Sequence, residues 1–116
     1  MHLHIDVTRV AGYTVVSPRG EIDFATGPQL KDAITELLVA GEVNLVIDLL
    51  AVDFIESTGL GALIGGRRRA HALKGSLVLA CTEQQVLKIF RITGLDKVFT
   101  IHDTVEAATG RSAVAS

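Results

Sequence analysis

The chain has 116 residues, of which 48% are apolar and 21% are charged, and its formal net charge is -2. This length allows one domain with a single core, and the apolar content excludes a chain that is disordered throughout. The slight acidity leaves no basic surface for nucleic acid or an anionic membrane, and the lack of Trp disfavours a base-stacking platform.

The single cysteine, Cys81, excludes an intrachain disulfide and a multi-cysteine zinc site. Residues 1–10 alternate polar and apolar side chains, so they do not resemble a secretory signal. No window reaches the roughly 18 apolar residues of a membrane-spanning helix. We therefore expect a cytoplasmic protein without a membrane or nucleic-acid partner.

The first predicted element is an antiparallel hairpin. Apolar and polar side chains alternate over residues 3–8, Ala11 and Gly12 interrupt the pattern, and a second apolar run covers residues 13–17. A helix is predicted from about Pro28, a residue suited to a first turn. Its packing face consists of apolar residues at helical spacing, namely Leu30, Ile34, Leu37 and Leu38. Gly41 is expected to end this helix.

Two later apolar runs predict central strands. Residues 43–50 (VNLVIDLL) and 76–81 (SLVLAC) are short and partly β-branched, as is typical of strands covered on both faces. Each is followed by a predicted helix, over about residues 58–73 and 83–92. The last predicted elements are a strand over residues 98–101 and a brief helix capped by Asp103 or Thr104.

This order predicts an α/β fold with a mixed, mostly parallel sheet. We expect about five strands, with the hairpin as an antiparallel edge, and about four helices. One domain should cover residues 1–109, and residues 110–116 should form a flexible tail. The open edge of the hairpin is compatible with a monomer or a weak dimer.

Residues 53–61 (DFIESTGLG) place acids, hydroxyls and glycines where a buried strand gives way to a helix. In open α/β sheets, sites gather at such strand ends. A hydroxyl of Ser57 or Thr58 at the helix start would face free N–H groups and the positive end of the helix, a geometry that accepts phosphate. Gly59 would allow another protein's backbone to approach. An ordinary helix cap explains the same pattern.

Four segments resemble the STAS-domain family, specifically the bacterial anti-sigma factor antagonists. They are GEID at 20–23, LVIDL at 45–49, DFIESTGLG at 53–61 and LKIFRITGLDKVF at 87–99. The resemblance covers roughly residues 3–109 and keeps the order of the family throughout. It implies a STAS fold and a role in regulating a sigma factor.

The resemblance also implies a phosphorylation switch. An anti-sigma factor that is itself a serine kinase would phosphorylate Ser57, with Thr58 as the alternative acceptor, and a metal-dependent phosphatase would reverse this. The unphosphorylated form would bind the anti-sigma factor and release the sigma factor. Asp23 matches an acid that the family holds beside the serine. The residue before that serine is usually Asp, whereas here it is Glu56, whose carboxylate is one methylene farther from the backbone.

A surface for this partner is predicted on the helix after Ser57. Two apolar anchors and two cations form one stripe, a combination that suits a protein interface: Leu60, Ile64, Arg67 and Arg68. The alternative is that Leu60 and Ile64 complete the core and the arginines are merely solvated.

No cofactor or metal site is predicted. The histidines lack ligand spacing, and no GxGxxG or Walker motif follows a strand. A hydrolase built on Ser57 would need a positioned base, and the GxSxG elbow is absent. The chain is therefore predicted to be a binding module and not an enzyme. The alternative within the fold is a STAS scaffold or transport-associated subunit that is never phosphorylated, which the Glu56 substitution would favour.

Overall fold

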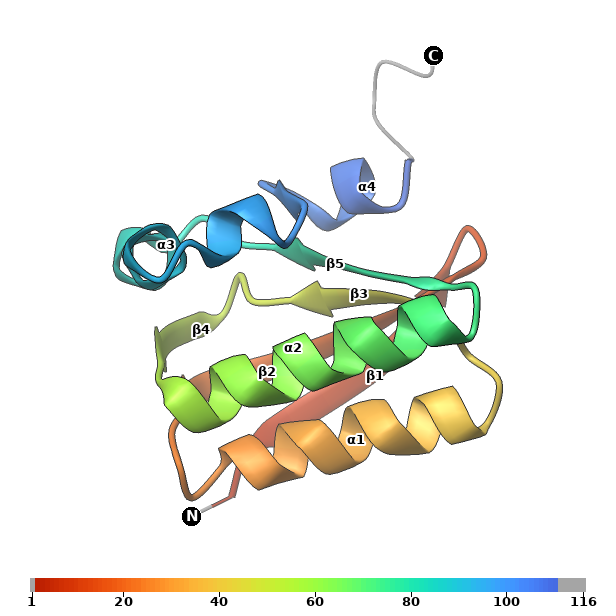
Figure 1. The fold of residues 1–116 in the computed structure, drawn as a ribbon, viewed down its shortest axis with the longest axis horizontal. Helices are drawn as coiled ribbons and strands as arrows, with labels where there is room; N and C mark the ends of the chain where they lie inside the picture. The colour runs from red at the N-terminus through yellow and green to blue at the C-terminus, as the bar shows by residue number, and fades with distance from the viewer. Residues whose placement is uncertain (1, 111–116) are drawn as a thin grey trace.

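The strands form one mixed six-stranded sheet in the computed structural model, which describes residues 2–110. The order is β1-β2-β3-β5-β6, and β4 pairs separately with β2 (Figure 1). The β1–β2 pair is antiparallel and the other pairs are parallel. The strands are β1 (His4–Val10), β2 (Tyr13–Ile22), β3 (Asn44–Asp48), β4 (Val52–Ile55), β5 (Ser76–Ala80) and β6 (Ile101–His102).

Helices pack on both faces of this sheet. The main core joins α1, α2 and α3 to one face of the central strands. The short α4 covers Val15 and Val46 on the other face. None of the helices within residues 2–110 has the length and apolar character needed to cross a membrane. The helices are α1 (Gly27–Val39), α2 (Ser57–Ala72), α3 (Gln84–Ile92) and α4 (Val105–Ala108).

The fold class is confirmed, but two local predictions were wrong. Residues 53–61 do not run directly from a central strand into a helix, because the separate strand β4 lies between them and adds a sixth strand. Residues 98–101 are not a full strand: Gly94 has a φ of 74° and begins a 3-10 turn, η1 (Leu95–Lys97), so only the two residues of β6 pair with β5. The predicted tail, apart from Gly110, lies outside the described residues.

Helices α1 and α2 run side by side, and glycines let them pack closely (Figure 1). A Cβ on Gly27, at the start of α1, would lie 2.7 Å from Cγ2 of Thr58, at the start of α2. A Cβ on Gly66 would lie 2.9 Å from Cγ2 of Ile34. Such separations are shorter than packed carbon atoms allow, so the missing side chains set the spacing of the two helices.

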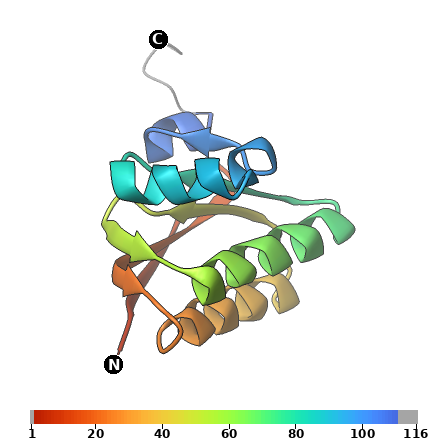
Figure 2. The ribbon, with the colours of Figure 1, turned by 60° about the vertical axis from the view of Figure 1, so that its left-hand side comes forward.

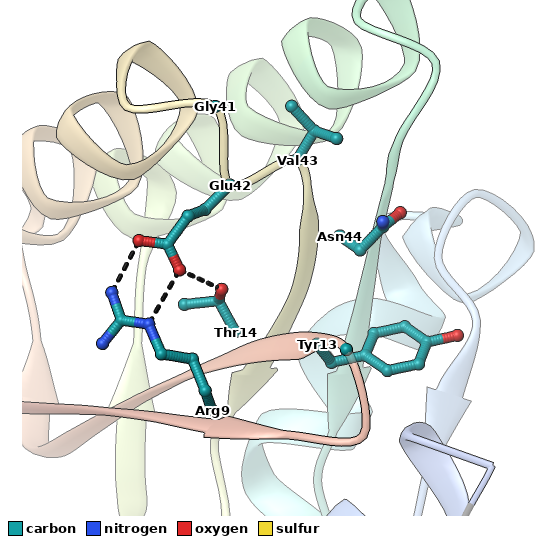
Figure 3. A pocket seen from close by; sticks show the side chains of 8 residues that line it. Arg9, Tyr13, Thr14, Gly41, Glu42, Val43 and Asn44 are labelled. Atoms are coloured by element: carbon teal, nitrogen blue, oxygen red, sulfur yellow. Dashed lines mark hydrogen bonds and ion pairs between the residues drawn. The ribbon is translucent and has the colours of Figure 1, made fainter.

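An ion pair joins the β1–β2 hairpin to the loop between α1 and β3. Nε and Nη2 of Arg9 donate to Glu42 at 2.9 and 2.6 Å, and Oγ1 of Thr14 donates to the same carboxylate at 2.6 Å (Figure 3). The hydrogen bonds from Arg9 and then from Thr14 lower the pKa of Glu42. These groups form part of the wall of a pocket of about 260 Å³.

We predict that Glu42→Gln lowers the melting temperature at pH 7 and that the difference from the parent protein shrinks in acid. The pKa of Glu42 is lower in the folded chain than its ordinary value of 4.5, so the ionised carboxylate stabilises the folded state at pH values above 4.5. This stabilisation disappears as the pH falls through the folded pKa. Circular dichroism melts at pH 7 and at a pH below the lowered folded pKa of Glu42 would measure it. Glu36→Gln, an exposed change on α1, is the control. An equal deficit at both pH values would contradict the electrostatic explanation.

Candidate functional site at the paired ends of β2 and β4

The pairing of β4 with β2 brings two acidic residues together. Ile22 and Ile55 are partners in the parallel register, and they end their strands. The amide of Glu56 also donates to the carbonyl of Ile22 at 3.1 Å. Asp23 and Glu56 directly follow these two isoleucines. They therefore lie next to each other at the same edge of the sheet. Figure 2, which turns this edge forward, shows the loop before α1 next to the first turn of α2.

Glu56 is the N-cap of α2. Its backbone is extended, its Oε1 accepts a hydrogen bond from the Thr58 amide at 3.1 Å, and its carbonyl accepts the first intrahelical bond from Leu60. The prediction that Ser57 or Thr58 caps the helix was therefore wrong, because the longer acid before them reaches the free N–H group. Ser57 is instead the first helical residue. Glu83 caps α3 in the same way, through the amide of Gln85.

Asp23 organises the loop between β2 and α1. Its Oδ1 accepts hydrogen bonds from the amides of Ala25 and Thr26, each at 2.9 Å, and from Oγ1 of Thr26 at 3.0 Å. The backbone hydrogen bond from Thr26 is the main cause that lowers the pKa of the Asp23 carboxyl. The side chain thus keeps its negative charge beside α2 and fixes the loop conformation.

The two candidate hydroxyl groups differ in exposure. Ser57 is exposed on the first turn of α2, whereas Thr58 is half-buried. The methyl group of Thr58 packs against the start of α1, where only a glycine, Gly27, fits. The prediction that Gly59 lets another protein's backbone approach was wrong, because Gly59 is buried against the core: a Cβ there would lie 2.6 Å from Cγ2 of Ile22. An approaching protein thus meets the hydroxyl of Ser57 first.

The predicted partner stripe on α2 needs one correction. Leu60 is 8% exposed and belongs to the core, so it cannot serve as an exposed anchor. Ile64 is partly buried against the same core, Arg67 is half-buried and Arg68 is exposed. At 100° per residue, Arg68 lies nearly in line with Ser57, three turns further along α2.

Gly61 and the partly buried Ile64 lie between Ser57 and Arg68 on this line. Gly61 is exposed, and a Cβ there would meet no other atom within 4 Å. The backbone of α2 is therefore accessible one turn after Ser57. We call the line of Ser57, Gly61, Ile64 and Arg68 the α2 stripe.

Sequence reasoning missed two exposed aromatic residues near this edge. Phe24, directly after Asp23, is 75% exposed, and Phe54 in β4 is 45% exposed. Phe54 also lines a cavity of about 140 Å³ between β4 and α3. A large apolar side chain in an otherwise polar loop, as at Phe24, was the available sequence signal. Its exposure could be learned only from the structure.

Other chemistry-bearing residues do not join the site. Cys81 is buried, and this burial raises the pKa of its thiol. Within residues 2–110, no group of three or more His, Cys, Asp or Glu side chains is arranged to hold a metal ion. The site described here consists of an exposed hydroxyl, two flanking carboxylates and the amino terminus of a helix of 16 residues.

Comparison with known proteins places this chain in a family. The profile of the STAS domain matches residues 4–108. The chain is 33% identical over 94 residues to an anti-sigma-B factor antagonist of Listeria monocytogenes, covering 81% of this chain and 82% of that protein. The chain belongs to the STAS-domain family.

Solved structures agree with this assignment. The crystal structure of an anti-sigma factor antagonist from Mycobacterium paratuberculosis has a TM-score of 0.85 and 32% identity, covering 93% of this chain and 92% of that chain. The Bacillus cell fate determinant SpoIIAA, in its phosphorylated form, has the same fold with a TM-score of 0.69 and 21% identity, covering 90% and 96% of the two chains.

We predict that Glu56→Ala lowers the free energy of unfolding by about 1 kcal/mol, because it removes an N-cap acceptor. Glu56→Gln is the matched variant, since its amide oxygen can still accept from the Thr58 amide and should retain most of the stability. Urea unfolding followed by circular dichroism measures both. If the two variants lost the same stability, the cap would not be the role of the Glu56 side chain.

Proposed function

We propose that this protein is an anti-sigma factor antagonist that acts as a binding module and not as an enzyme. The observation that supports this proposal most is the exposed Ser57, which directly follows Glu56 at the sheet edge from which Asp23 also emerges. The names of the Listeria and Mycobacterium relatives support the class of function. The partner is an anti-sigma factor serine kinase, and binding to it in the cytoplasm releases a sigma factor.

Phosphate on Ser57 is the proposed off-switch. A phosphoserine carries about -1.5 to -2 charges at neutral pH, and here it would join two carboxylates. In the free protein, the amino terminus of α2 stabilises that charge. In the complex, a partner surface fitted to a neutral hydroxyl would bury it at a high desolvation cost. Phosphorylation thus weakens binding without unfolding the domain, and a metal-dependent phosphatase restores the binding form.

Glu56 fits this role although the family usually has Asp there. Its carboxylate reaches the Thr58 amide and caps α2, so the additional methylene does not displace the helix start from the serine. The substitution therefore gives little support to the alternative of a scaffold or transport-associated subunit that is never phosphorylated. That alternative predicts that no kinase which binds the protein transfers phosphate to it.

Transfer of phosphate is the direct test. We expect intact-mass spectrometry to show one added phosphate after incubation with ATP, magnesium and a candidate anti-sigma kinase. Ser57→Ala should abolish the transfer, whereas Thr58→Val should retain it, because Thr58 is packed against α1. Ser57→Asp should bind the kinase at least about tenfold more weakly than Ser57→Ala, since a charge is buried against the partner. Equal affinities of these two variants would refute the switch.

Phe24 is predicted to anchor the partner. Phe24→Ala should weaken binding of the unphosphorylated protein about tenfold, because large side chains near the centre of an interface dominate its energy. The melting temperature should stay the same, since Phe24 is 75% exposed. Val39→Ala, at the far end of α1 and 83% exposed, is the matched control and should bind normally. If both variants bound like the parent protein in calorimetric titrations, the docking surface would not include this loop.

A further inference from the structure

A cavity of about 140 Å³ lies between β4 and α3, and we call it the β4–α3 socket. Helix α3 packs against β4, and both lie at the same end of the molecule as the first turn of α2 (Figure 1). The socket is therefore on the side of the molecule that carries Ser57. The lining residues are Asp53, Phe54 and Ile55 of β4 with Gln85, Val86 and Ile89 of α3.

The inner part of the socket is apolar and the outer part is polar. Ile55 and Val86 are 2% and 1% exposed, whereas Phe54 provides an aromatic wall that is 45% exposed. Asp53 and Gln85 are exposed polar residues of the same lining. An apolar group that entered would remove apolar surface from water, whereas a charged group would lose its hydration. The socket thus selects an uncharged apolar group.

The volume limits what can enter. A protein cavity of about 150 Å³ holds one benzene molecule. The socket, at about 140 Å³, has nearly this volume. It is smaller than the sites of about 300–1,000 Å³ that bind drug-sized molecules. One aliphatic side chain of the size of leucine therefore matches the socket better than a cofactor or a metabolite does.

The socket is close enough to Ser57 to lie under the same partner. Asp53 and Phe54 precede Ser57 by four and three residues. Because an extended residue spans about 3.3 Å, these lining residues are within about 13 Å of Ser57 along the chain. A standard interface covers about 800 Å² on each protein, which corresponds to a disc of about 16 Å radius. A protein that binds with Ser57 at the centre of its interface therefore also covers the socket.

We propose that the β4–α3 socket receives one leucine-sized aliphatic side chain of the kinase that acts on Ser57. This inference rests on the proposed function and adds a docking contact that is separate from the reacting hydroxyl. Side chains buried in pockets of an interface, with a surrounding ring that excludes water, contribute most of its energy. Asp53 and Gln85 form part of that ring here. The socket thus sets the affinity for the partner and takes no part in the transfer itself.

Two adjacent glutamines at the start of α3 provide a matched pair of variants. Gln85→Trp places an indole at the socket, whereas Gln84→Trp changes an exposed residue that does not line it. Transfer of phosphate is measured with ATP, magnesium and candidate anti-sigma kinases. Gln85→Trp should raise the KM for the protein substrate about tenfold and leave kcat unchanged, because only docking is lost. Gln84→Trp should behave like the parent protein.

A second variant covers the case that Gln85→Trp fails to fold. Phe54→Ala removes a wall of the socket and should also raise KM about tenfold. Val98→Ala, at a residue that is 41% exposed and outside the lining, is its control and should leave KM unchanged.

The outcomes separate this inference from the proposed function. Transfer to the parent protein, with an unchanged KM for Gln85→Trp and Phe54→Ala, would overturn the inference and leave the proposed function intact. Absence of transfer to the parent protein from every candidate kinase would overturn both. If Gln85→Trp instead converted a dimer of the free protein into a monomer in sedimentation, the occupant would be a second copy and the inference would be wrong.

Discussion

The parallel pairing of β4 with β2 is the constraint on which the site depends. Only three residue pairs form this ladder, and the last joins Ile22 to Ile55. The bond from the Glu56 amide to the Ile22 carbonyl extends it by one step. Because both strands end at the same level, Asp23 and Glu56 emerge together, and α2 begins at once with Ser57. If β4 were unpaired, the serine and the two acids would have no fixed relation.

Close packing of α1 on α2 then holds this edge in place. Gly27 and Thr58 are in contact at the start of the two helices, and Gly66 approaches Ile34 farther along them. The same contacts explain why two adjacent hydroxyl groups are not equivalent. Thr58 is used in the packing between helices, whereas Ser57 turns to solvent. The proposed phosphate on Ser57 would therefore change the charge of the surface and leave the core unchanged.

Different charged groups lie at the two ends of α1 and α2. At the edge with Ser57, the carboxylate of Asp23 accepts a hydrogen bond that orders the loop before α1, and the carboxylate of Glu56 caps α2. Both groups also make this surface acidic. At the other end of the same two helices, Arg69 lies in an apolar groove within a cationic segment. The charges at this end are mixed, since Glu42 follows α1 there and pairs with Arg9.

The sequence by itself determined the fold class, the hairpin, the central strands and the position of Ser57 at a helix start, because these follow from local hydrophobic periodicity and from the residues that interrupt it. It could not determine that Glu56 is the cap, that β4 pairs with β2, or that Leu60 is core and Phe24 is exposed. The pairing of β4 and the exposures of Leu60 and Phe24 depend on contacts between segments that are distant in the chain or on which face a neighbouring element covers. The Glu56 cap is a local contact with the Thr58 amide, but it depends on where β4 ends and α2 begins. Tertiary structure alone decided them, because burial and strand pairing are properties of the assembled layers and not of a local pattern.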